Sequence, residues 1–295
     1  ALDPSLVEVP REYLQRVLSI QVESLDWEVL GFAHQGVEAT PHLNEVAKQG
    51  LLLKLNPRHS AISGSSGADF QFLTMLLPPQ RRLGLREAYL EQLDTLPRAL
   101  ARQGIPTIAM HGNAASFWSR GLAYPRLGVE RFIERKDYPA CDGGWGVSDE
   151  TFFRHNAALI NARPGPAHHF MITLSSHAPF NWVRDQAFGG GGMGFDYLNS
   201  IHYTDRALQG FFLALKGRFL VVVYGDHASN VQNLVYNSRP KGREFVPGLL
   251  FLLDEGRVKP LSLRRRPPEL LDGSCDIRTL STLLKALMER QGSPH

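Results

Sequence analysis

The chain has 295 residues, of which 43% are hydrophobic and 21% are charged, so it can bury a sizeable core and is not expected to be disordered. Its net charge of +3 is too small to indicate a nucleic-acid-binding protein. No run of about 18–20 apolar residues occurs, so no segment of the sequence is expected to span a membrane.

Residues 1–16 are predicted to form a short polar lead-in, and residues 17–295 a single domain without internal repeats. The chain begins without a methionine, a basic segment or an apolar signal sequence, so we expect it to be a domain of a longer protein. Its two cysteines, Cys141 and Cys275, leave their pairing and the redox compartment open.

The predicted elements alternate between strands and helices. A β-branched run at 17–22 predicts a strand that ends at Glu23. Thr40 and Pro41 predict a helix start, with Thr40 as N-cap, and Gly50 ends that helix. The later predictions are a strand at 51–56, helices at 69–77 and 94–103, strands at 107–110 and 170–174, a helix at 196–216, strands at 219–224, 248–253 and 257–261, and a helix at 276–290 capped by Asp276.

Apolar strands alternating with helices predict an α/β fold, in which a mostly parallel central sheet lies between helix layers. Such sheets place their ligand sites beyond the carboxyl ends of the strands. Four predicted strands lead into polar residues of ligand type, namely Glu23, His111, His177 and the pair Asp226-His227. We therefore expect these side chains to gather at one edge of the sheet.

Asp226 and His227 follow a fully apolar strand and offer a carboxylate and an imidazole. This mixed oxygen and nitrogen set suits Mn²⁺ or Zn²⁺ better than Ca²⁺. A turn in which Asp226 bonds its own backbone explains the same residues equally well. Glu23 is costly after a buried strand unless it is paired, binds a cation or reaches solvent.

The segment Gly64-Ser65-Ser66-Gly67 could present a hydroxyl at a helix start, where backbone amides favour a phosphate. A hydroxyl needs a base or a metal to become a good nucleophile. By composition alone, a flexible polar loop is the better explanation. The segment lacks the Gly-x-Ser-x-Gly spacing, which disfavours an α/β-hydrolase triad.

His111 and His177 could each contact a phosphate, donate a proton or be buried without a function. Arg120 suits a bidentate contact with phosphate, and Trp118 could form an apolar wall. The alternative is a tryptophan in the core and an arginine at the surface.

Seven segments, in chain order, carry a family resemblance: residues 21–24, 40–44, 64–70, 96–97, 110–120, 172–180 and 224–227. Together they resemble the extracellular catalytic domain of lipoteichoic acid synthase and the Gram-negative phosphoglycerol transferases of periplasmic glucans. This group lies in the sulfatase branch of the alkaline-phosphatase superfamily, so the resemblance implies a sulfatase-like fold over residues 17–290. A sulfatase activity is rejected, because Ser65-Ser66-Gly67-Ala68-Asp69 lacks the proline and arginine of a formylglycine motif.

The resemblance also implies roles for individual residues. One divalent metal, typically Mn²⁺ with Mg²⁺ or Zn²⁺ as alternatives, is held by Glu23, Ser65, Asp226 and His227. Ser65 stands where the family nucleophile, usually threonine, stands, and Ser63 and Ser66 are neighbouring alternatives. Contacts with the phosphoglycerol are implied for His111, Trp118, Arg120 and His177. Either His177 or His111 could protonate a leaving oxygen.

The implied function is a phosphoglycerol transferase that takes glycerophosphate from phosphatidylglycerol or a related lipid through a covalent Ser65 intermediate. A hydroxyl of a periplasmic glucan or a teichoic-acid-like polymer is the implied acceptor. The resemblance implies a location at the periplasmic or extracytoplasmic face of the membrane, with residues 1–16 as the linker to a membrane anchor. The alternatives are a phosphoethanolamine transferase (a class that usually carries several disulfides), a phosphodiesterase of the same superfamily, and an inactive binding module.

Overall fold

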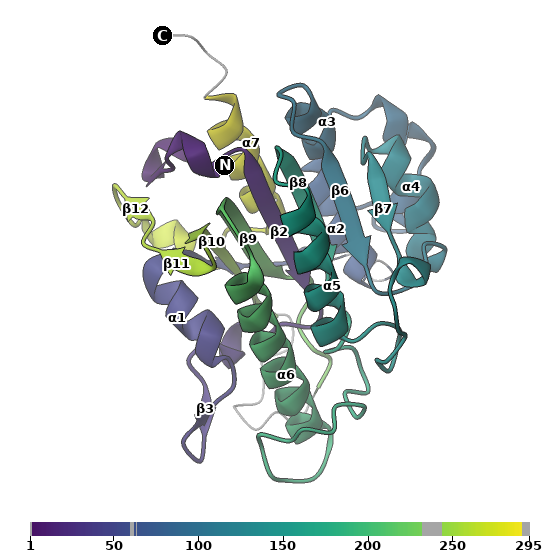
Figure 1. Ribbon diagram of the computed structural model, residues 1–295, viewed down its shortest axis with the longest axis vertical. Coiled ribbons are helices and arrows are strands. Elements are labelled where there is room, and N and C mark those ends of the chain that lie inside the picture. The colour runs from purple at the N-terminus through teal and green to yellow at the C-terminus, as the bar shows by residue number, and fades with distance from the viewer. Residues whose placement is uncertain (1, 60–61, 63, 232–243, 291–295) are drawn as a thin grey trace.

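The structure is a computed structural model that describes residues 2–59, 62, 64–231 and 244–290. Its central feature is a sheet that has eight strands within the described residues, with helices packed on both faces (Figure 1). In spatial order the strands are β11 (Arg257–Lys259), β10 (Val246–Asp254), β9 (Arg218–Gly225), β2 (Arg16–Val22), β8 (Ala167–Ile172), β6 (Thr107–His111) and β7 (Arg131–Ile133), and β5 (Leu51–Leu55) also pairs with β10.

The centre of this sheet is parallel and one edge is antiparallel. Strand β2 pairs in parallel with β8 and β9, and β6 pairs in parallel with β8 and β7. Strand β10 runs antiparallel to β9, β5 and β11. The predicted mostly parallel sheet between helix layers is thereby confirmed. The parallel strands β2, β6, β8 and β9 end at the same edge, where the predicted ligand-type residues follow them.

The helices form two layers, with α1, α5 and α6 on one face and α2, α3 and α7 on the other (Figure 1). Helix α4 lies beside β7. The α-helices are α1 (Pro41–Gln49), α2 (Gly64–Thr74), α3 (Leu96–Ala101), α4 (Arg120–Arg126), α5 (Asp149–Ala162), α6 (Met193–Ala214) and α7 (Ile277–Glu289). Two-residue strands form the pairs β1 (Val7–Glu8) with β12 (Ser262–Leu263) and β3 (Ala33–His34) with β4 (Val37–Glu38). Short 3-10 helices span Pro4–Leu6, Arg11–Tyr13, Trp27–Val29, Gly84–Arg86, Ala88–Gln92, Phe117–Ser119, Arg135–Asp137 and Pro268–Leu270.

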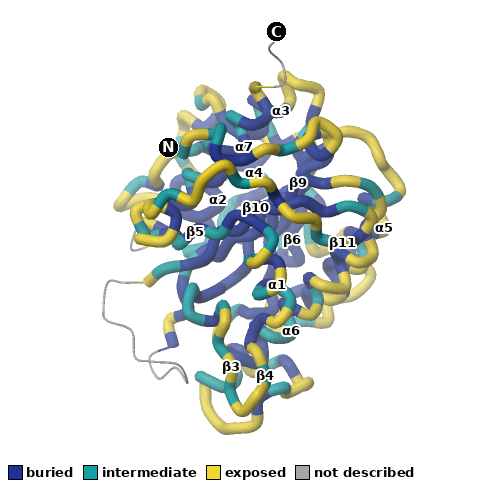
Figure 2. The backbone as a smooth tube through the Cα atoms, turned by 90° about the vertical axis from the view of Figure 1, so that its left-hand side faces the viewer, coloured by how far each residue is buried: buried dark blue, intermediate teal, exposed yellow. Residues whose placement is uncertain are grey.

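The two faces of the sheet carry separate apolar cores, because side chains alternate along each strand. On β2, Leu18 and Ile20 pack in the core beneath α5 and α6, whereas Val17 packs in the core beneath α2 and α7. Ser19 and Gln21 share the face of Val17 and are also fully buried. Figure 2 shows the buried residues running through the central strands. Polar side chains on this face therefore need partners inside the protein.

Most predicted elements lie within a few residues of their observed bounds, and the differences have physical causes. The helix predicted at 69–77 begins earlier, at Gly64, so Ser65 lies in its first turn. Thr40 occupies the N-cap position of α1 but makes no side-chain cap. The backbone amides of His42 and Leu43 instead donate to Asp205 on α6. Tertiary contact therefore replaces the local cap that the sequence predicted.

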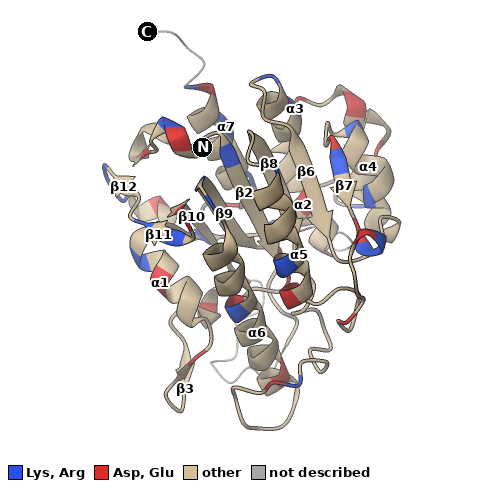
Figure 3. Ribbon diagram, viewed as in Figure 1, with Lys and Arg blue, Asp and Glu red and all other residues tan. Residues whose placement is uncertain are grey.

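Residues 2–14, which belong to the polar lead-in predicted at 1–16, pack onto the domain. Leu6, Tyr13 and Leu14 are buried in the core beneath α2 and α7, and β1 pairs with β12. Among the described helices, none is long and apolar enough to cross a membrane. Lysine and arginine residues are interspersed with acidic residues along the ribbon (Figure 3), consistent with the small net charge.

Candidate metal centre and active site

Two neighbouring parallel strands bring Glu23 and Asp226 together. Val22 at the end of β2 lies opposite Gly225 at the end of β9, so the next residue of each strand leaves the sheet at the same point. Both carboxylates are buried, with 4% of Glu23 and none of Asp226 exposed. The close approach requires a glycine at 225, because a Cβ there would lie 2.5 Å from the carbonyl oxygen of Leu25.

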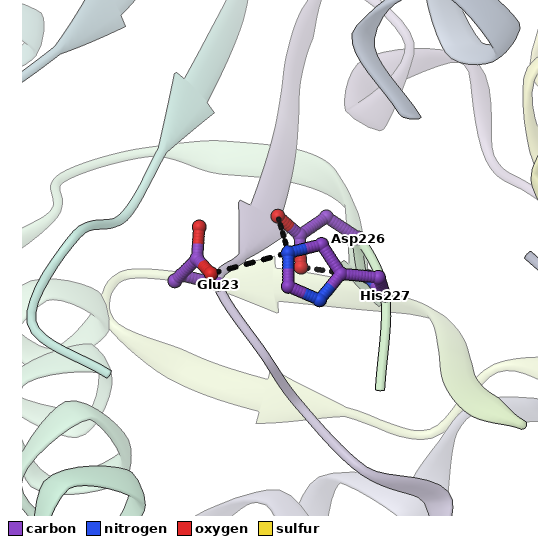
Figure 4. A group of neighbouring side chains, drawn as sticks. All are labelled: Glu23, Asp226 and His227. Carbon is purple, nitrogen blue, oxygen red and sulfur yellow. Dashed lines mark hydrogen bonds and ion pairs between the residues drawn. The ribbon is translucent and has the colours of Figure 1, made fainter. Parts of the chain in front are cut away.

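His227 completes a cluster of three ligand-type side chains (Figure 4). Its Nε2 lies 3.3 Å from Glu23 Oε1 and 3.6 Å from Asp226 Oδ2. Asp226 Oδ1 accepts hydrogen bonds from the backbone amides of Ser24 and His227 at 2.9 and 2.7 Å. Asp226 Oδ2 has no hydrogen-bond partner within the described part of the chain. A buried carboxylate oxygen without a donor is the group that a cation satisfies best.

Ser65 adds a hydroxyl to this cluster from the first turn of α2. Its Oγ donates to Glu23 Oε2 at 3.0 Å and lies 3.5 Å from His227 Nε2. The helix begins at Gly64, whose φ of +42° is a backbone conformation that side chains other than glycine rarely adopt. The start of a helix also presents free backbone amides, which favour a negatively charged group nearby.

The charges of the cluster are strongly coupled. Burial raises the pKa of Asp226 and the charge of Glu23 raises it further, to about 7. Burial acts against the charged form of His227, but Asp226 and Glu23 together raise its pKa to about 10. Burial likewise opposes ionisation of Glu23, yet His227 lowers the pKa of this carboxyl below its usual value. The imidazolium therefore supplies the positive charge that the two carboxylates require, a charge that a divalent cation would supply in its place.

Two carboxylates, one imidazole and one hydroxyl form a donor set that fits a divalent ion such as Mn²⁺ or Zn²⁺. The four residues predicted to hold the metal are thus brought together. Of the alternative hydroxyls, Ser63 lies outside the described residues, and Ser66 is buried with 2% exposed.

His111 is buried at the end of β6, with 2% of its surface exposed. Its Nδ1 lies 3.0 Å from the carbonyl oxygen of Ile172, which can only accept, so Nδ1 carries the proton. Nε2 has no hydrogen-bond partner in the described residues. Burial, assisted by the charge of Arg120, lowers the pKa of His111 to about 3. At neutral pH Nε2 is therefore a hydrogen-bond acceptor.

His177 is partly exposed and follows β8 by five residues. Its Nδ1 donates to the carbonyl oxygen of Ala178 at 2.8 Å, and its ring contacts that of Trp145 in a tilted arrangement with centroids 4.3 Å apart. Its charge lowers the pKa of Glu23, after the larger effects of burial and His227.

Trp118 lies in the short 3-10 helix Phe117–Ser119 and Arg120 begins α4, both after β6. Trp118 has a positive φ of 56°, and its ring lies beside Gly64, where an added Cβ would be 3.8 Å from Cζ2. Arg120 is 1% exposed, so the alternative of a surface arginine is wrong. Its Nε donates to Asp69 Oδ2 at 2.7 Å and its Nη2 to Oδ1 at 3.3 Å.

Sequence reasoning assigned no role to three residues near the cluster. The ring of His59 lies 5.8 Å from that of His227, and Trp145 covers His177. Asp69 pairs with Arg120. Only Asp69 had a sequence signal, because it lies four residues after Ser65 and so on the same face of a helix.

A family model described as sulfatase matches residues 15–255. Lipoteichoic acid synthase 2 of Bacillus subtilis is 28% identical over 234 residues, which cover 74% of this chain and 36% of the synthase. A lipoteichoic acid synthase of Staphylococcus aureus is 27% identical over 238 residues, again covering 74% of this chain and 36% of the relative. The chain thus spans 36% of the length of these curated relatives.

Solved structures match nearly the whole chain. The lipoteichoic acid synthase LtaP of Listeria monocytogenes superposes with a TM-score of 0.72 at 20% identity, over 96% of this chain and 76% of its own. The Streptococcus pyogenes phosphoglycerol transferase GacH, in complex with sn-glycerol-1-phosphate, gives 0.64 at 17% identity, over 97% and 76%. The soluble domain of lipooligosaccharide phosphoethanolamine transferase A of Neisseria meningitidis gives 0.56 at 15%, over 85% and 80%. These matches establish the sulfatase-like α/β fold.

Proposed function

The chain belongs to the sulfatase family, and we propose that it is a metal-dependent phosphoglycerol transferase whose nucleophile is Ser65. One observation carries the proposal. The Ser65 hydroxyl lies at a helix start, in contact with Glu23 and His227, within a donor set that includes Asp226 Oδ2, a buried oxygen that accepts no hydrogen bond within the described residues. The similarity to lipoteichoic acid synthases and to the phosphoglycerol transferase GacH supports phosphoglycerol as the transferred group.

Glu23, Ser65, Asp226 and His227 would hold the metal, with Mn²⁺ as the proposed ion and Mg²⁺ or Zn²⁺ as alternatives. A bound divalent metal lowers the pKa of a hydroxyl and stabilises negative charge on phosphoryl oxygens. Ser65 Oγ already donates to Glu23 Oε2 at 3.0 Å, so the proton lost on attack has an acceptor in place. The hydroxyl is therefore held ready to act as a nucleophile.

In the proposed reaction Ser65 Oγ forms a bond to the phosphorus of phosphatidylglycerol, and the bond from phosphorus to the diacylglycerol oxygen breaks. Diacylglycerol leaves with a proton, for which His177 at the partly exposed end of the cluster is the proposed donor. An acceptor hydroxyl then gives its proton to the now neutral His177 and bonds to the phosphorus, while the bond from phosphorus to Ser65 Oγ breaks and Ser65 takes back the proton held by Glu23. A glycan or polyol chain outside the cytoplasmic membrane is the proposed acceptor.

The other predicted substrate residues have distinct proposed tasks. His111 Nε2 can only accept at neutral pH, so it suits a glycerol hydroxyl and not an anionic phosphate oxygen. Arg120 supplies positive charge for the phosphate, and Trp118 beside Gly64 supplies an apolar wall. A head group that carries a hydroxyl, such as phosphoglycerol, fits these tasks.

A phosphoethanolamine transferase is the second candidate, supported by the structural match to such an enzyme from Neisseria meningitidis. Two features favour phosphoglycerol. Cys141 is exposed and Cys275 is buried, and both are free, whereas the resemblance associates the phosphoethanolamine enzymes with several disulfides. The GacH structure, which carries glycerol phosphate, also has the higher TM-score.

The test uses the protein loaded with Mn²⁺ and phosphatidylglycerol labelled in its head group. We expect release of diacylglycerol and a glycerophosphate adduct on Ser65 by mass spectrometry. Phosphatidylethanolamine, offered in parallel, distinguishes the second candidate. An adduct on Ser66 or Ser63 would move the nucleophile, and the absence of both adduct and diacylglycerol with either lipid would refute both activities.

A further inference from the structure

The metal cluster lies above a second, fully buried polar layer to which no role has been assigned. From this layer we infer that Asp69 is a positioning residue, which fixes Arg120 for contact with a phosphate group and couples it to Ser65. The inference rests on the proposed function, because it takes Arg120 to be a phosphate-binding residue. It goes beyond that function because it gives a role to Asp69, a carboxylate that orients Arg120 and contacts neither the metal nor the substrate itself.

Asp69 is a saturated acceptor. Its Oδ2 accepts from Arg120 Nε at 2.7 Å and from the Tyr124 hydroxyl at 2.7 Å. Its Oδ1 accepts from Gln21 Nε2 at 2.8 Å and from Arg120 Nη2 at 3.3 Å. All four side chains are buried. A carboxylate offers about four acceptor positions, so Asp69 has none left for a substrate or a metal.

Gln21 connects this carboxylate to the nucleophile. Its Nε2 also donates to the backbone carbonyl oxygen of Ser65 at 3.3 Å, and its Oε1 accepts from the Tyr224 hydroxyl at 2.9 Å. Gln21 thus uses both ends of its amide inside the protein. The positions of the Ser65 backbone and of the Arg120 guanidinium are therefore set by one continuous set of hydrogen bonds.

Each residue of the buried layer lies next to a residue of the proposed site on the same face of a strand or helix. On a strand, residues two apart share a face, and on a helix residues four apart do. The two residues of each pair are two positions apart on a strand and its continuation, or four positions apart on a helix. The pairs are Gln21 with Glu23, Tyr224 with Asp226, Asp69 with Ser65 and Tyr124 with Arg120. The hydrogen bonds of the layer therefore hold β2, β9, α2 and α4 together at the points from which the side chains of the site extend.

Arg120 shows why a positioning carboxylate is needed. Asp69 engages its Nε and Nη2 along one edge of the guanidinium, and the Tyr124 hydroxyl also interacts with Arg120. An arginine held along one edge keeps its other edge free in a fixed direction. Burial lowers the pKa of His111 and the positive charge of Arg120 lowers it further, and His111 Nε2 has no hydrogen-bond partner in the described residues.

The test is a double-mutant cycle read by the binding of inorganic phosphate to the Mn²⁺-loaded protein in calorimetry. The proteins are the wild type, Asp69→Asn, Arg120→Gln and the double variant. We expect Asp69→Asn to weaken phosphate binding about tenfold when Arg120 is present, and less than about twofold in the Arg120→Gln background. Equal weakening in both backgrounds, no weakening in either, or a wild type that binds no phosphate would each overturn the inference.

Manganese affinity is the second readout and should be the same in all four proteins. A parallel loss of manganese would mean that Asp69 acts on the metal cluster, which would also overturn the inference. If Asp69→Asn fails to fold, Tyr124→Phe takes its place, because it removes one hydrogen bond to Asp69 and keeps the ion pair. We expect it to weaken phosphate binding about threefold, again only when Arg120 is present.

Asp205→Asn is the matched control, since Asp205 is a buried carboxylate on α6, on the opposite face of the sheet. It should leave phosphate affinity unchanged. Release of diacylglycerol from phosphatidylglycerol is measured on the same proteins. If the wild type releases no diacylglycerol but the double-mutant cycle of phosphate binding gives the expected result, the proposed function alone is refuted. If diacylglycerol is released but the cycle does not give the expected result, the inference alone is refuted.

Discussion

At the scale of single residues, Ser65 is the side chain on which the proposed reaction depends most. Removing a nucleophile typically costs several orders of magnitude in rate, so we expect Ser65→Ala to release diacylglycerol at least about 10³-fold more slowly than the wild type. Ser65→Thr keeps the hydroxyl and should retain activity within about tenfold. Ser66→Ala is the matched control and should behave like the wild type. Comparable losses at positions 65 and 66 would contradict the assignment.

Asp226 carries the metal prediction, because its Oδ2 is buried without a hydrogen-bond partner in the described residues. Asp226→Asn replaces an anionic ligand by a neutral one of the same shape. We expect it to lower the affinity for Mn²⁺ by at least about 100-fold, measured by calorimetry and by metal content after dialysis. Asp205→Asn should bind Mn²⁺ as the wild type does. Full metal content in both Asp226→Asn and Glu23→Gln would remove the basis of the proposed centre.

The sequence could predict which residue types lie at strand ends, but not which of them are buried or paired. Asp226 and His227 follow an apolar strand, so their place at the sheet edge was predictable. The burial of Arg120 was not, because its partner Asp69 lies 51 residues away in the sequence. The acceptor role of His111 Nε2 likewise depends on the carbonyl of Ile172, on a neighbouring strand.

At the scale of elements, the strands were predicted better than the starts of helices. Apolar runs such as 219–224 identify a buried strand whatever surrounds it, and β9 spans 218–225. Helix α2 begins five residues before the predicted position, in a stretch of glycine and serine with low helix propensity. Its first turn is held by the contacts of Ser65 with Glu23 and Gln21, which local sequence does not contain.

Helix α1 shows the same effect at its N-terminus and yields a prediction. Asp205 accepts the amides of His42 and Leu43 at 2.9 Å each, so Asp205→Ala leaves two buried donors without a partner. We expect the free energy of unfolding to fall by about 2 kcal/mol, measured by urea denaturation. Thr40→Ala should cost less, because the Thr40 hydroxyl caps no amide and donates only to the Val29 carbonyl oxygen and to Asn44 Oδ1, at 3.2 and 3.1 Å. Equal losses for the two variants would show that Asp205 does not act as the cap.

At the scale of the whole molecule, the order of the strands decides where the site forms. Glu23, Ser65 and Asp226 are distant in sequence and meet because β2 lies between β8 and β9, with α2 packed on the same face as Gln21. The alternation of elements predicts a parallel sheet but not this order. The antiparallel edge formed by β10, β5 and β11 could not be predicted either, because an apolar run carries no direction.

The interior of the sheet also contains neutral histidines, which link folding to pH. His168 on β8 is fully buried between the hydroxyls of Thr107 and Ser19, at 3.0 and 2.9 Å. Burial, assisted by His169, lowers its pKa to about 3 from an ordinary value of 6.5. Below pH 6.5 the unfolded chain therefore takes up a proton at this residue, whereas the folded protein does not. The stability contributed by neutral His168 is present above pH 6.5 and is lost as the pH falls toward 3.

This linkage predicts how one variant responds to acid. His168→Gln removes the titrating group and should be less stable than the wild type at pH 8. The difference between their free energies of unfolding should then shrink by about 1.4 kcal/mol for each pH unit between pH 6 and 4, since one proton is involved. Urea denaturation at pH 8, 6, 5 and 4 measures it. Phe170→Leu, a change on the same strand that affects packing alone, should keep a constant difference from the wild type. A constant difference for His168→Gln as well would mean that His168 protonates in the folded state as readily as in the unfolded chain.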